Sequence, residues 1–575
     1  MKRYWKYIRP YIQYYILGPC FMMMEVVGDV LLPYMLAKII NQGIAERNVA
    51  YIIKIGAIMG FIAVIMAVGG VLGAWFASKA AMNFGADLRM DLFEKIQQFS
   101  FQNIDNFSTG SLITRLTNDI TQIQNMIMMT LRMCLRSPGI LIGAMVMAFV
   151  ISPKLAAIFI IVLPVLAVLI VVIMRRAFPQ FRTLQEKLDA LNSCIQEGLV
   201  GIRLIKSFVR GDYEEMRFEK RNQQLKEANL TAMKTMLLYT PLMTLALNIT
   251  TVVVVWSGGN MIVAGNMQVG DLTAFTNYIV QIMSSLTMLS IAFLNWARAI
   301  ASFRRVGEVL DEEIDLTDEN AKHKDRAVCE GSVEFQNVSF RYYKNSPEWV
   351  IENISFKLEA GKTLGIIGST GSGKSTLVSM IPRLYDTDEG TVLVDGINVR
   401  DYGLKPLREG IGMVLQNNTL FSGSITENLK WGDEHADEKA VRKAAQNAQA
   451  AGFIDSFKDG YRTRLEQSGN NVSGGQKQRL CIARALLKCP KILILDDSTS
   501  AVDTATERAI REALHSEYKD MTKIIIAQRI RSVMDADEIL VLDNGKTAGF
   551  GTHEQLLADC PVYREIYDVQ NGREE

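Results

Sequence analysis

A glycine-rich stretch at 368–376, GSTGSGKST, has the residue types and spacing of a phosphate-binding loop. An apolar strand sequence at 364–367 precedes it and a helical sequence follows it, which is the context that this pattern requires. The glycines let backbone N–H groups wrap a phosphate chain, and the start of the helix adds a partial positive charge. The predicted phosphate-binding residues are Gly368, Ser369, Thr370, Gly371, Ser372, Gly373, Lys374, Ser375 and Thr376.

Two side chains of this loop and two carboxylates further along the chain could support metal-assisted phosphoryl chemistry. We expect Lys374 to reach the β- and γ-phosphates and the Ser375 hydroxyl to coordinate Mg²⁺. The apolar strand sequence ILILDD ends in Asp496 and Asp497, and Asp496 matches the Walker B aspartate of P-loop ATPases, which holds Mg²⁺ through water. The two motifs together predict ATP and Mg²⁺ as cofactors.

A third motif, NVSGGQKQRL, lies between these two. The three motifs together resemble the ABC (ATP-binding cassette) family, whose signature sequence is LSGGQ. Ser473, Gly474, Gly475 and Gln476 match this signature, and Val472 replaces its leading leucine. The resemblance implies that the signature acts in trans, on ATP held by a second nucleotide domain.

Further landmarks of the family follow in order along the chain. The resemblance implies that Tyr342 stacks on adenine, that Gln416 joins Mg²⁺ to the contact with the membrane domain, and that Asp503 belongs to the D-loop. In the N-terminal half, the segments at 107–120 and 195–218 look like the intracellular loops of ABC exporters. In such folds, these long loops end in short helices that dock on the nucleotide domains.

Two positions depart from the family pattern, and both belong to its hydrolytic apparatus. Asp497 stands where the family has a glutamate that polarises the attacking water, and Gln528 stands where it has a switch histidine. Asp497 is one methylene shorter than glutamate, and a displacement of about 1 Å can lower a rate about 10²-fold. Gln528 can donate a hydrogen bond, but it cannot carry the charge of imidazole. We therefore expect a site that binds ATP and hydrolyses it slowly.

The family geometry gives this expectation a consequence for assembly. Two nucleotide domains pack head to tail, so each ATP lies between one P-loop and the other chain's signature. A heterodimer would combine the impaired site of this chain with a competent site, which the signature of this chain completes for a partner. The alternative is a homodimer in which Asp497 works slowly.

Six apolar runs predict six membrane-spanning helices in the N-terminal half, and hydrophobic residues make up 49% of the whole chain. A span needs about 20 apolar residues to cross a bilayer core of about 30 Å. The runs lie at 14–40, 55–77, 140–151, 155–174, 236–263 and 269–300, with only the residues 152–154 separating the third from the fourth.

The links between these runs alternate in length. Short links lie near 41–50, 152–154 and 264–270, whereas the long links near 78–125 and 175–235 are helical in pattern and basic. The positive-inside rule places the long links and both termini in the cytoplasm. No organellar targeting segment precedes the first span, so we expect a multi-pass protein of a bacterial plasma membrane.

The predicted fold class is an α-helical six-span membrane domain with long cytoplasmic helical extensions, followed by an α/β P-loop nucleotide-binding domain of the ABC type. We place an interfacial stretch at 1–10, the membrane domain at 11–304, a charged linker at 305–330 and the nucleotide-binding domain at 331–575. Lys and Arg number 62 against 61 Asp and Glu, which gives no reason to expect nucleic acid as a partner.

Glu25 and Asp29 lie four residues apart, on one face of the first predicted span. Charged groups at membrane depth are costly and face a cavity or a partner. One hypothesis is that these carboxylates recognise cationic amphiphiles. The alternative is that they pair with Arg132, Arg136 or Arg298, or lie near a water-filled mouth.

The resemblance implies an ATP-driven exporter that works by alternating access. We expect amphiphilic small molecules or drugs as substrates, and a second half-transporter as partner in the lipid bilayer. Export of a lipid, peptide or other metabolite is the alternative within the same architecture. A mainly regulatory ATP-binding subunit with little catalysis of its own is an alternative of another class, and the intact signature argues against it.

Overall fold

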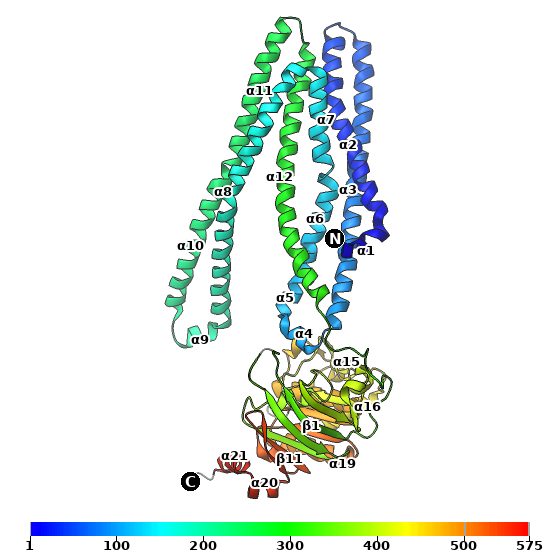
Figure 1. The fold of residues 1–575 in the computed structure, drawn as a ribbon, viewed down its shortest axis with the longest axis vertical. Helices are drawn as coiled ribbons and strands as arrows, with labels where there is room; N and C mark the ends of the chain where they lie inside the picture. Colours follow the sequence, from blue (N-terminus) through cyan, green and yellow to red (C-terminus); the bar gives the residue numbers. More distant parts are fainter. Residues whose placement is uncertain (1, 345, 499–501, 573–575) are drawn as a thin grey trace. The chain divides into compact units, whose positions relative to one another are not determined.

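The computed structural model describes residues 2–344, 346–498 and 502–572, and it divides into two compact units. The membrane unit comprises Met1–Ile96 and Gly110–Asp311, and the nucleotide unit comprises Gln97–Thr109 and Glu312–Glu575 (Figure 1). The short segment Gln97–Thr109 therefore packs with the nucleotide unit, although it belongs to the long link at 78–125 between the second and third predicted spans.

The membrane unit is helical. Its helices are α1 (Trp5–Ile8), α2 (Ile12–Lys38), α3 (Val49–Gln97), α5 (Thr109–Thr114), α6 (Ile120–Met133), α7 (Arg136–Ile151), α8 (Pro153–Val200), α9 (Ile202–Ser207), α10 (Gly211–Leu237), α11 (Tyr239–Val263) and α12 (Val269–Asp311), with π-helical turns at Ile39–Ile44 and Arg115–Asp119. Among the described residues, five helical stretches are long and apolar enough to cross a membrane, and they contain the first five predicted spans. The sixth predicted span lies in α12, where several side chains fall outside the described residues.

The long links are helical, as the sequence predicts. Helices α3 and α8 contain 49 and 48 residues, more than twice the length that a bilayer core requires. Helices α8 and α10 lie side by side, and α9 joins their ends (Figure 1). The predicted tight turn is present as well, because α7 ends at Ile151 and the Ser152 hydroxyl caps α8 by accepting a hydrogen bond from the Leu155 amide at 3.4 Å.

The core of the membrane unit lies where α12 packs against α2, α7 and α11. Phe275, Tyr278 and Ile282 of α12 are fully buried there. The Tyr278 hydroxyl donates a hydrogen bond to the Val30 carbonyl oxygen of α2 at 2.8 Å. Large apolar side chains also cover the outer faces of the helices, as expected where lipid tails replace water.

The nucleotide unit contains two main sheets. One is antiparallel, in the order β2 (Ile351–Leu358), β1 (Val333–Phe340), β4 (Glu389–Val394) and β5 (Ile397–Asn398). The other has the order β12 (Lys546–Gly551), β11 (Glu538–Asp543), β3 (Thr363–Gly368), β10 (Thr522–Ile526), β9 (Ile492–Asp496) and β6 (Ile411–Val414). All of its pairs are parallel except β11 with β12. A two-residue pair joins β7 (Gly423–Ser424) to β8 (Arg464–Leu465).

Helices surround these sheets. They are α4 (Phe101–Asn106), α13 (Lys374–Ser379), α14 (Leu404–Glu409), α15 (Ile425–Leu429), α16 (Glu438–Asn447), α17 (Ala451–Ser456), α18 (Gly474–Leu487), α19 (Thr504–Glu517), α20 (His553–Asp559) and α21 (Pro561–Asn571). A capping box begins α15, because the Ser424 hydroxyl accepts from the Glu427 amide and the Glu427 carboxylate accepts from the Ser424 amide at 2.7 Å.

The parallel sheet brings distant motifs to one edge. Strand β10 pairs with β3 on one side and with β9 on the other, with Ile526 opposite Ile366 and Asp496. The carboxyl ends of parallel strands meet at the same edge of a sheet, where ligands bind in open α/β folds. The phosphate-binding loop follows β3, Asp497 follows β9, and Gln528 follows β10 by two residues.

Candidate nucleotide-binding site

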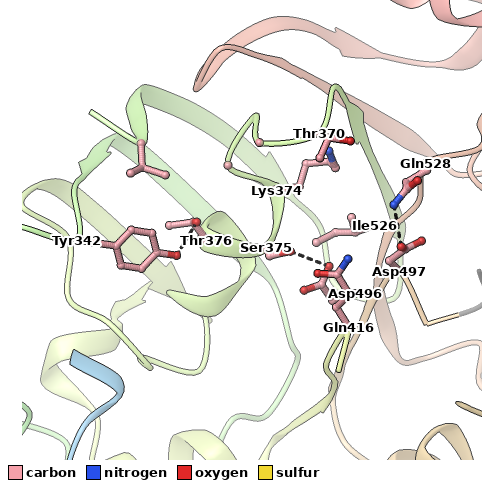
Figure 2. A pocket seen from close by; sticks show the side chains of 13 residues that line it. Tyr342, Thr370, Lys374, Ser375, Thr376, Gln416, Asp496, Asp497, Ile526 and Gln528 are labelled. Atoms are coloured by element: carbon pink, nitrogen blue, oxygen red, sulfur yellow. Dashed lines mark hydrogen bonds between the residues drawn. The ribbon is translucent and has the colours of Figure 1, made fainter. Parts of the chain in front are cut away.

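A cavity of about 310 Å³ lies at this edge of the sheet. Figure 2 shows the side chains of the predicted motifs around it. Its lining residues are Tyr342, Val350, Thr370, Gly371, Gly373, Lys374, Ser375, Thr376, Gln416, Asp496, Asp497, Ile526 and Gln528. The structure thus brings together eleven of the residues that the sequence predicts to act on nucleotide, from segments nearly 190 residues apart.

The phosphate-binding loop needs glycine at position 373 for two reasons. Gly373 has φ of +90°, a conformation that residues with a side chain rarely adopt. A Cβ atom there would lie 2.6 Å from Ile351 Cγ2 and 2.9 Å from the Val350 carbonyl oxygen. Helix α13 begins at the next residue, and the first N–H groups of a helix have no acceptor within that helix. The loop therefore presents backbone donors to the cavity.

Lys374 folds back over the loop that carries it. Its Nζ donates to the carbonyl oxygens of Gly368 at 2.9 Å and Ser369 at 2.6 Å, and lies 3.4 Å from the Ser372 hydroxyl. Burial lowers the pKa of Lys374, and the charges of Asp496 and Asp497 oppose this shift. The ammonium group is held by weak, neutral acceptors, which a phosphate oxygen can replace at little cost.

Two hard oxygen ligands converge beside the lysine. The Ser375 hydroxyl donates to Asp496 Oδ1 at 3.0 Å, and Asp496 is almost fully buried at the end of β9. Burial raises the pKa of Asp496, while the hydrogen bond from Ser375 opposes this rise. A hydroxyl and a carboxylate at this separation fit Mg²⁺, which prefers oxygen ligands and is bound by one or two carboxylates together with substrate phosphates.

The two positions that depart from the family pattern contact each other. Gln528 Nε2 donates to Asp497 Oδ2 at 2.9 Å (Figure 2). Asp497 has φ of +47°, in the left-handed region, where aspartate is tolerated better than most side chains. Burial raises the pKa of Asp497, and the hydrogen bond from Gln528 and the charge of Lys374 oppose this rise. One carboxylate oxygen is therefore already engaged by the neighbouring amide.

Tyr342 lines the other end of the cavity. Its hydroxyl shares a hydrogen bond of 2.8 Å with Thr376 Oγ1 (Figure 2). The side chain is 38% exposed, so one part of the ring is accessible to a ligand. This position fits the predicted stacking on adenine, at the opposite end of the cavity from Asp497.

Some predicted residues do not line the cavity. Gly368 and Ser369 of the loop accept hydrogen bonds from Lys374 through their carbonyl oxygens, and Ser372 accepts one through its hydroxyl. The signature residues also lie elsewhere. Ser473 caps α18, accepting from the Gln476 amide at 3.3 Å, and Gln476 Oε1 accepts from the Ser473 amide at 2.9 Å.

The other two signature residues and Asp503 of the predicted D-loop lie outside the cavity as well. Gly474 and Gly475 form the first turn of α18. Asp503 caps α19 by accepting from the Thr506 amide at 3.0 Å. That backbone hydrogen bond lowers the pKa of Asp503.

Two apolar side chains of the cavity were not predicted. Val350 precedes β2 and Ile526 ends β10. Ile526 could have been inferred, because it lies two residues before Gln528 in a strand that must end at the same edge. Val350 leads into β2 of the antiparallel sheet, and no local signal in the sequence brings that sheet to the loop.

In the membrane unit, Glu25 and Asp29 of α2 pair with Arg136 of α7. Arg136 Nη2 lies 2.8 Å from Glu25 Oε1 and 3.3 Å from Asp29 Oδ2. This is one of the pairings that the sequence left open as the alternative to substrate recognition. The side chain of Arg298 lies outside the described residues. The ion pairs with Arg136 explain how two carboxylates can lie within a membrane-spanning helix.

Comparisons with known proteins identify the same two domains as the structure. The protein-family model of the ABC transporter transmembrane region matches residues 15–286, and the family model named ABC transporter matches residues 351–500. An uncharacterized ABC transporter ATP-binding protein of Bacillus subtilis, YfiB, is 39% identical over 574 residues, which cover 100% of this chain and 99% of the relative. A putative multidrug export ATP-binding/permease protein of the same organism, YgaD, is 33% identical and covers 99% of each chain.

The fold is similar to a solved structure as well. The structure of a bacterial Atm1-family ABC exporter with ATP bound matches with a TM-score of 0.81 at 24% identity, over 98% of each chain. A helical membrane domain is thus fused to an ATP-binding domain of the ABC type, whose ATPase activity drives transport. This multi-pass membrane protein, with bacterial relatives along its whole length, belongs to the ABC transporter family as a half-transporter.

Proposed function

We propose that this chain is one subunit of a heterodimeric exporter that moves amphiphilic small molecules out of a bacterial cell. Its own P-loop, Asp496 and Asp497 form a site that binds ATP with Mg²⁺ and hydrolyses it slowly. Its signature at Ser473 to Gln476 completes the faster site of a partner chain. ATP closes the two nucleotide domains and turns the membrane domains outward, and hydrolysis with product release resets them.

The contact between Gln528 and Asp497 is the observation that supports slow hydrolysis at this site. A general base must lie within hydrogen-bond reach of the water that it activates. Asp497 is one methylene too short for the role that glutamate has in the family, and Gln528 holds one of its oxygens at 2.9 Å. A glutamine also cannot supply the positive charge that a protonated histidine offers to developing charge on the γ-phosphate.

The groups that bind nucleotide are complete by contrast. Lys374, Ser375 and Asp496 converge on one end of the cavity, and Tyr342 lies at the other. Phosphoryl transfer depends on positioning and electrostatic stabilisation more than on covalent chemistry. Loss of the water-activating pair therefore slows hydrolysis and leaves binding in place.

Two exposed apolar surfaces support a dimer. At the tip formed by α8, α9 and α10, Val200 and Val209 are 83% and 88% exposed. In the nucleotide unit, the rings of Phe421 and Trp431 stack with centroids 4.3 Å apart, and Trp431 is 65% exposed. Exposed apolar side chains that gather on one element are typical of interaction sites. We propose that each tip packs on the nucleotide domain of the partner chain.

The proposed substrate class rests on YgaD, the relative described above as a putative multidrug export protein. The methionines would suit such substrates, because 14 of the 28 in the chain lie in the predicted spans, where they provide adaptable, polarizable surface. We place no substrate contact on Glu25 and Asp29, because Arg136 pairs with both.

The ATPase rate of the purified chain in lipid nanodiscs tests this proposal. We expect saturable ATP binding with turnover far below about 10 s⁻¹, which is a typical enzyme value, and little change on Asp497→Asn. A high turnover that Asp497→Asn abolishes would overturn the slow site. Co-expression with candidate half-transporters that carry the Glu and His should then raise turnover, and Ser473→Ala in this chain should lower it again.

A further inference from the structure

A continuous set of side-chain contacts in the nucleotide unit ties Tyr342 to helix α4. The Tyr342 ring meets the Tyr385 ring edge to face, with centroids 5.3 Å apart and planes at 83°. Tyr385 also meets the ring of Phe101 in α4, with centroids 5.9 Å apart. The Tyr385 hydroxyl donates to Asp105 Oδ2 of the same helix at 2.9 Å. One side chain thus contacts the predicted adenine-binding ring and both ends of α4.

Tyr385 is held firmly enough to transmit a displacement. Its ring packs against the core of the antiparallel sheet, where the Phe340 ring lies 5.4 Å away. Burial raises the pKa of Tyr385, and the hydrogen bond to Asp105 adds to this rise. The hydroxyl is therefore neutral and acts as the donor. Closely packed interiors shift as units because they contain few voids.

Helix α4 has a second anchor, which does not involve the nucleotide site. The Ser100 hydroxyl and the Asn103 side chain form a capping box at its start. Asn103 Nδ2 donates to Glu312 Oε1 at 3.1 Å and to the Glu313 carbonyl oxygen at 2.9 Å. These bonds fix α4 to the beginning of the linker. Of the two anchors, only the one through Tyr385 reaches Tyr342.

The contact of Tyr385 with α4 matters because α4 connects two helices of the membrane unit. Helix α3 ends at Gln97 and α5 begins at Thr109, so α4 is the connection between two helices that continue into the membrane unit. A change in how firmly α4 is held therefore acts on both helices through the chain itself.

We propose that Tyr385 is a positioning residue that makes the hold on α4 depend on whether a nucleobase occupies the site beside Tyr342. This rests on the proposed function, in which Tyr342 contacts the base. A stacked base restricts the Tyr342 ring, which in turn restricts Tyr385 and the bond to Asp105. A ligand that fills only the phosphate loop leaves the face of the ring unoccupied, although the Tyr342 hydroxyl still bonds to Thr376 Oγ1 of that loop. ATP should therefore restrain α4, and inorganic triphosphate should not.

Hydrogen–deuterium exchange of the peptide covering 97–110 tests this in the full-length chain in nanodiscs. Exchange is measured alone, with Mg²⁺-ATP and with Mg²⁺-tripolyphosphate, at saturation determined separately for each variant. The variants are Tyr385→Leu, which removes the ring and the hydroxyl, and Tyr385→Phe, which keeps the ring. Tyr343→Leu is the matched control, because Tyr343 is adjacent to Tyr342 and is 74% exposed.

We expect ATP to slow exchange in α4 by about two- to tenfold, the range of one hydrogen bond, with no effect of tripolyphosphate. Tyr385→Leu should abolish the slowing while ATP affinity changes less than about threefold, because Tyr385 does not line the cavity. Tyr385→Phe should keep part of the slowing, and Tyr343→Leu all of it.

Two results would overturn the proposal. One is slowing by ATP of the same size in Tyr385→Leu as in the unmodified chain. The other is equal slowing by tripolyphosphate. If Tyr385→Leu does not fold, Asp105→Ala must reduce the slowing instead, since it removes only the acceptor. An unmodified chain that binds no ATP would contradict the nucleotide site itself, which separates that failure from a failure of the coupling.

Discussion

Lengthening one side chain should restore hydrolysis at this site. Asp497→Glu moves the carboxylate outward by about one bond length, into a cavity of about 310 Å³ that already opens beside it. A displacement of about 1 Å from productive geometry can cost about 10²-fold in rate. We therefore expect turnover at the site of this chain to rise about 10²-fold, which corresponds to about 2.7 kcal/mol of activation free energy.

The assay is steady-state release of phosphate from saturating Mg²⁺-ATP by the chain in nanodiscs, together with ATP affinity from a fluorescent nucleotide. Asp559→Glu is the matched control, because it makes the same chemical change at an exposed position of α20. Gln528→His combined with Asp497→Glu should raise turnover further. Unchanged turnover in both variants, with ATP affinity intact, would refute the reasoning that the carboxylate reach limits this site.

Three further changes test other parts of the account. Gly373→Ala should weaken ATP binding at least tenfold in a nucleotide titration, because the left-handed backbone alone costs about 1–2 kcal/mol; binding within twofold would contradict the loop geometry. Arg136→Gln should lower the thermal unfolding temperature by leaving carboxylates unpaired, and adding Glu25→Gln and Asp29→Asn should recover most of the loss. Capping hydrogen bonds lower the pKa of Glu427, so their contribution is present above the unfolded pKa of about 4.3 and is lost as pH falls through the lower folded pKa. Amide exchange in α15 should accordingly differ between the unmodified chain and Glu427→Gln at pH 7 and become equal in strong acid; a constant difference would contradict the cap.

The sequence predicted which residues line the cavity where local pattern and topology both constrain them. The loop before Lys374 needs its glycines for backbone reasons that a pattern expresses directly. Asp496 ends one buried apolar strand and Gln528 follows another by two residues, and parallel strands bring their carboxyl ends together. The meeting of these residues in one cavity was therefore predictable without a structure.

Other contacts depend on packing between distant segments. Tyr385 and Asp105 are 280 residues apart, and nothing near either residue indicates the other. The seating of Gln97–Thr109 in the nucleotide unit follows from such contacts. Arg136 was one of three open partners for the carboxylates of α2, because helix periodicity alone does not fix which face of α7 meets α2.

The central claim is that this chain holds ATP without hydrolysing it rapidly, and a single-turnover experiment tests it most directly. Radiolabelled Mg²⁺-ATP is bound to the chain in nanodiscs, free nucleotide is removed, and the bound ATP and ADP are separated after acid quenching at increasing times. The account predicts that the unmodified chain still carries mainly ATP when Asp497→Glu carries mainly ADP. Conversion of bound ATP to ADP at the same rate in both proteins would contradict it.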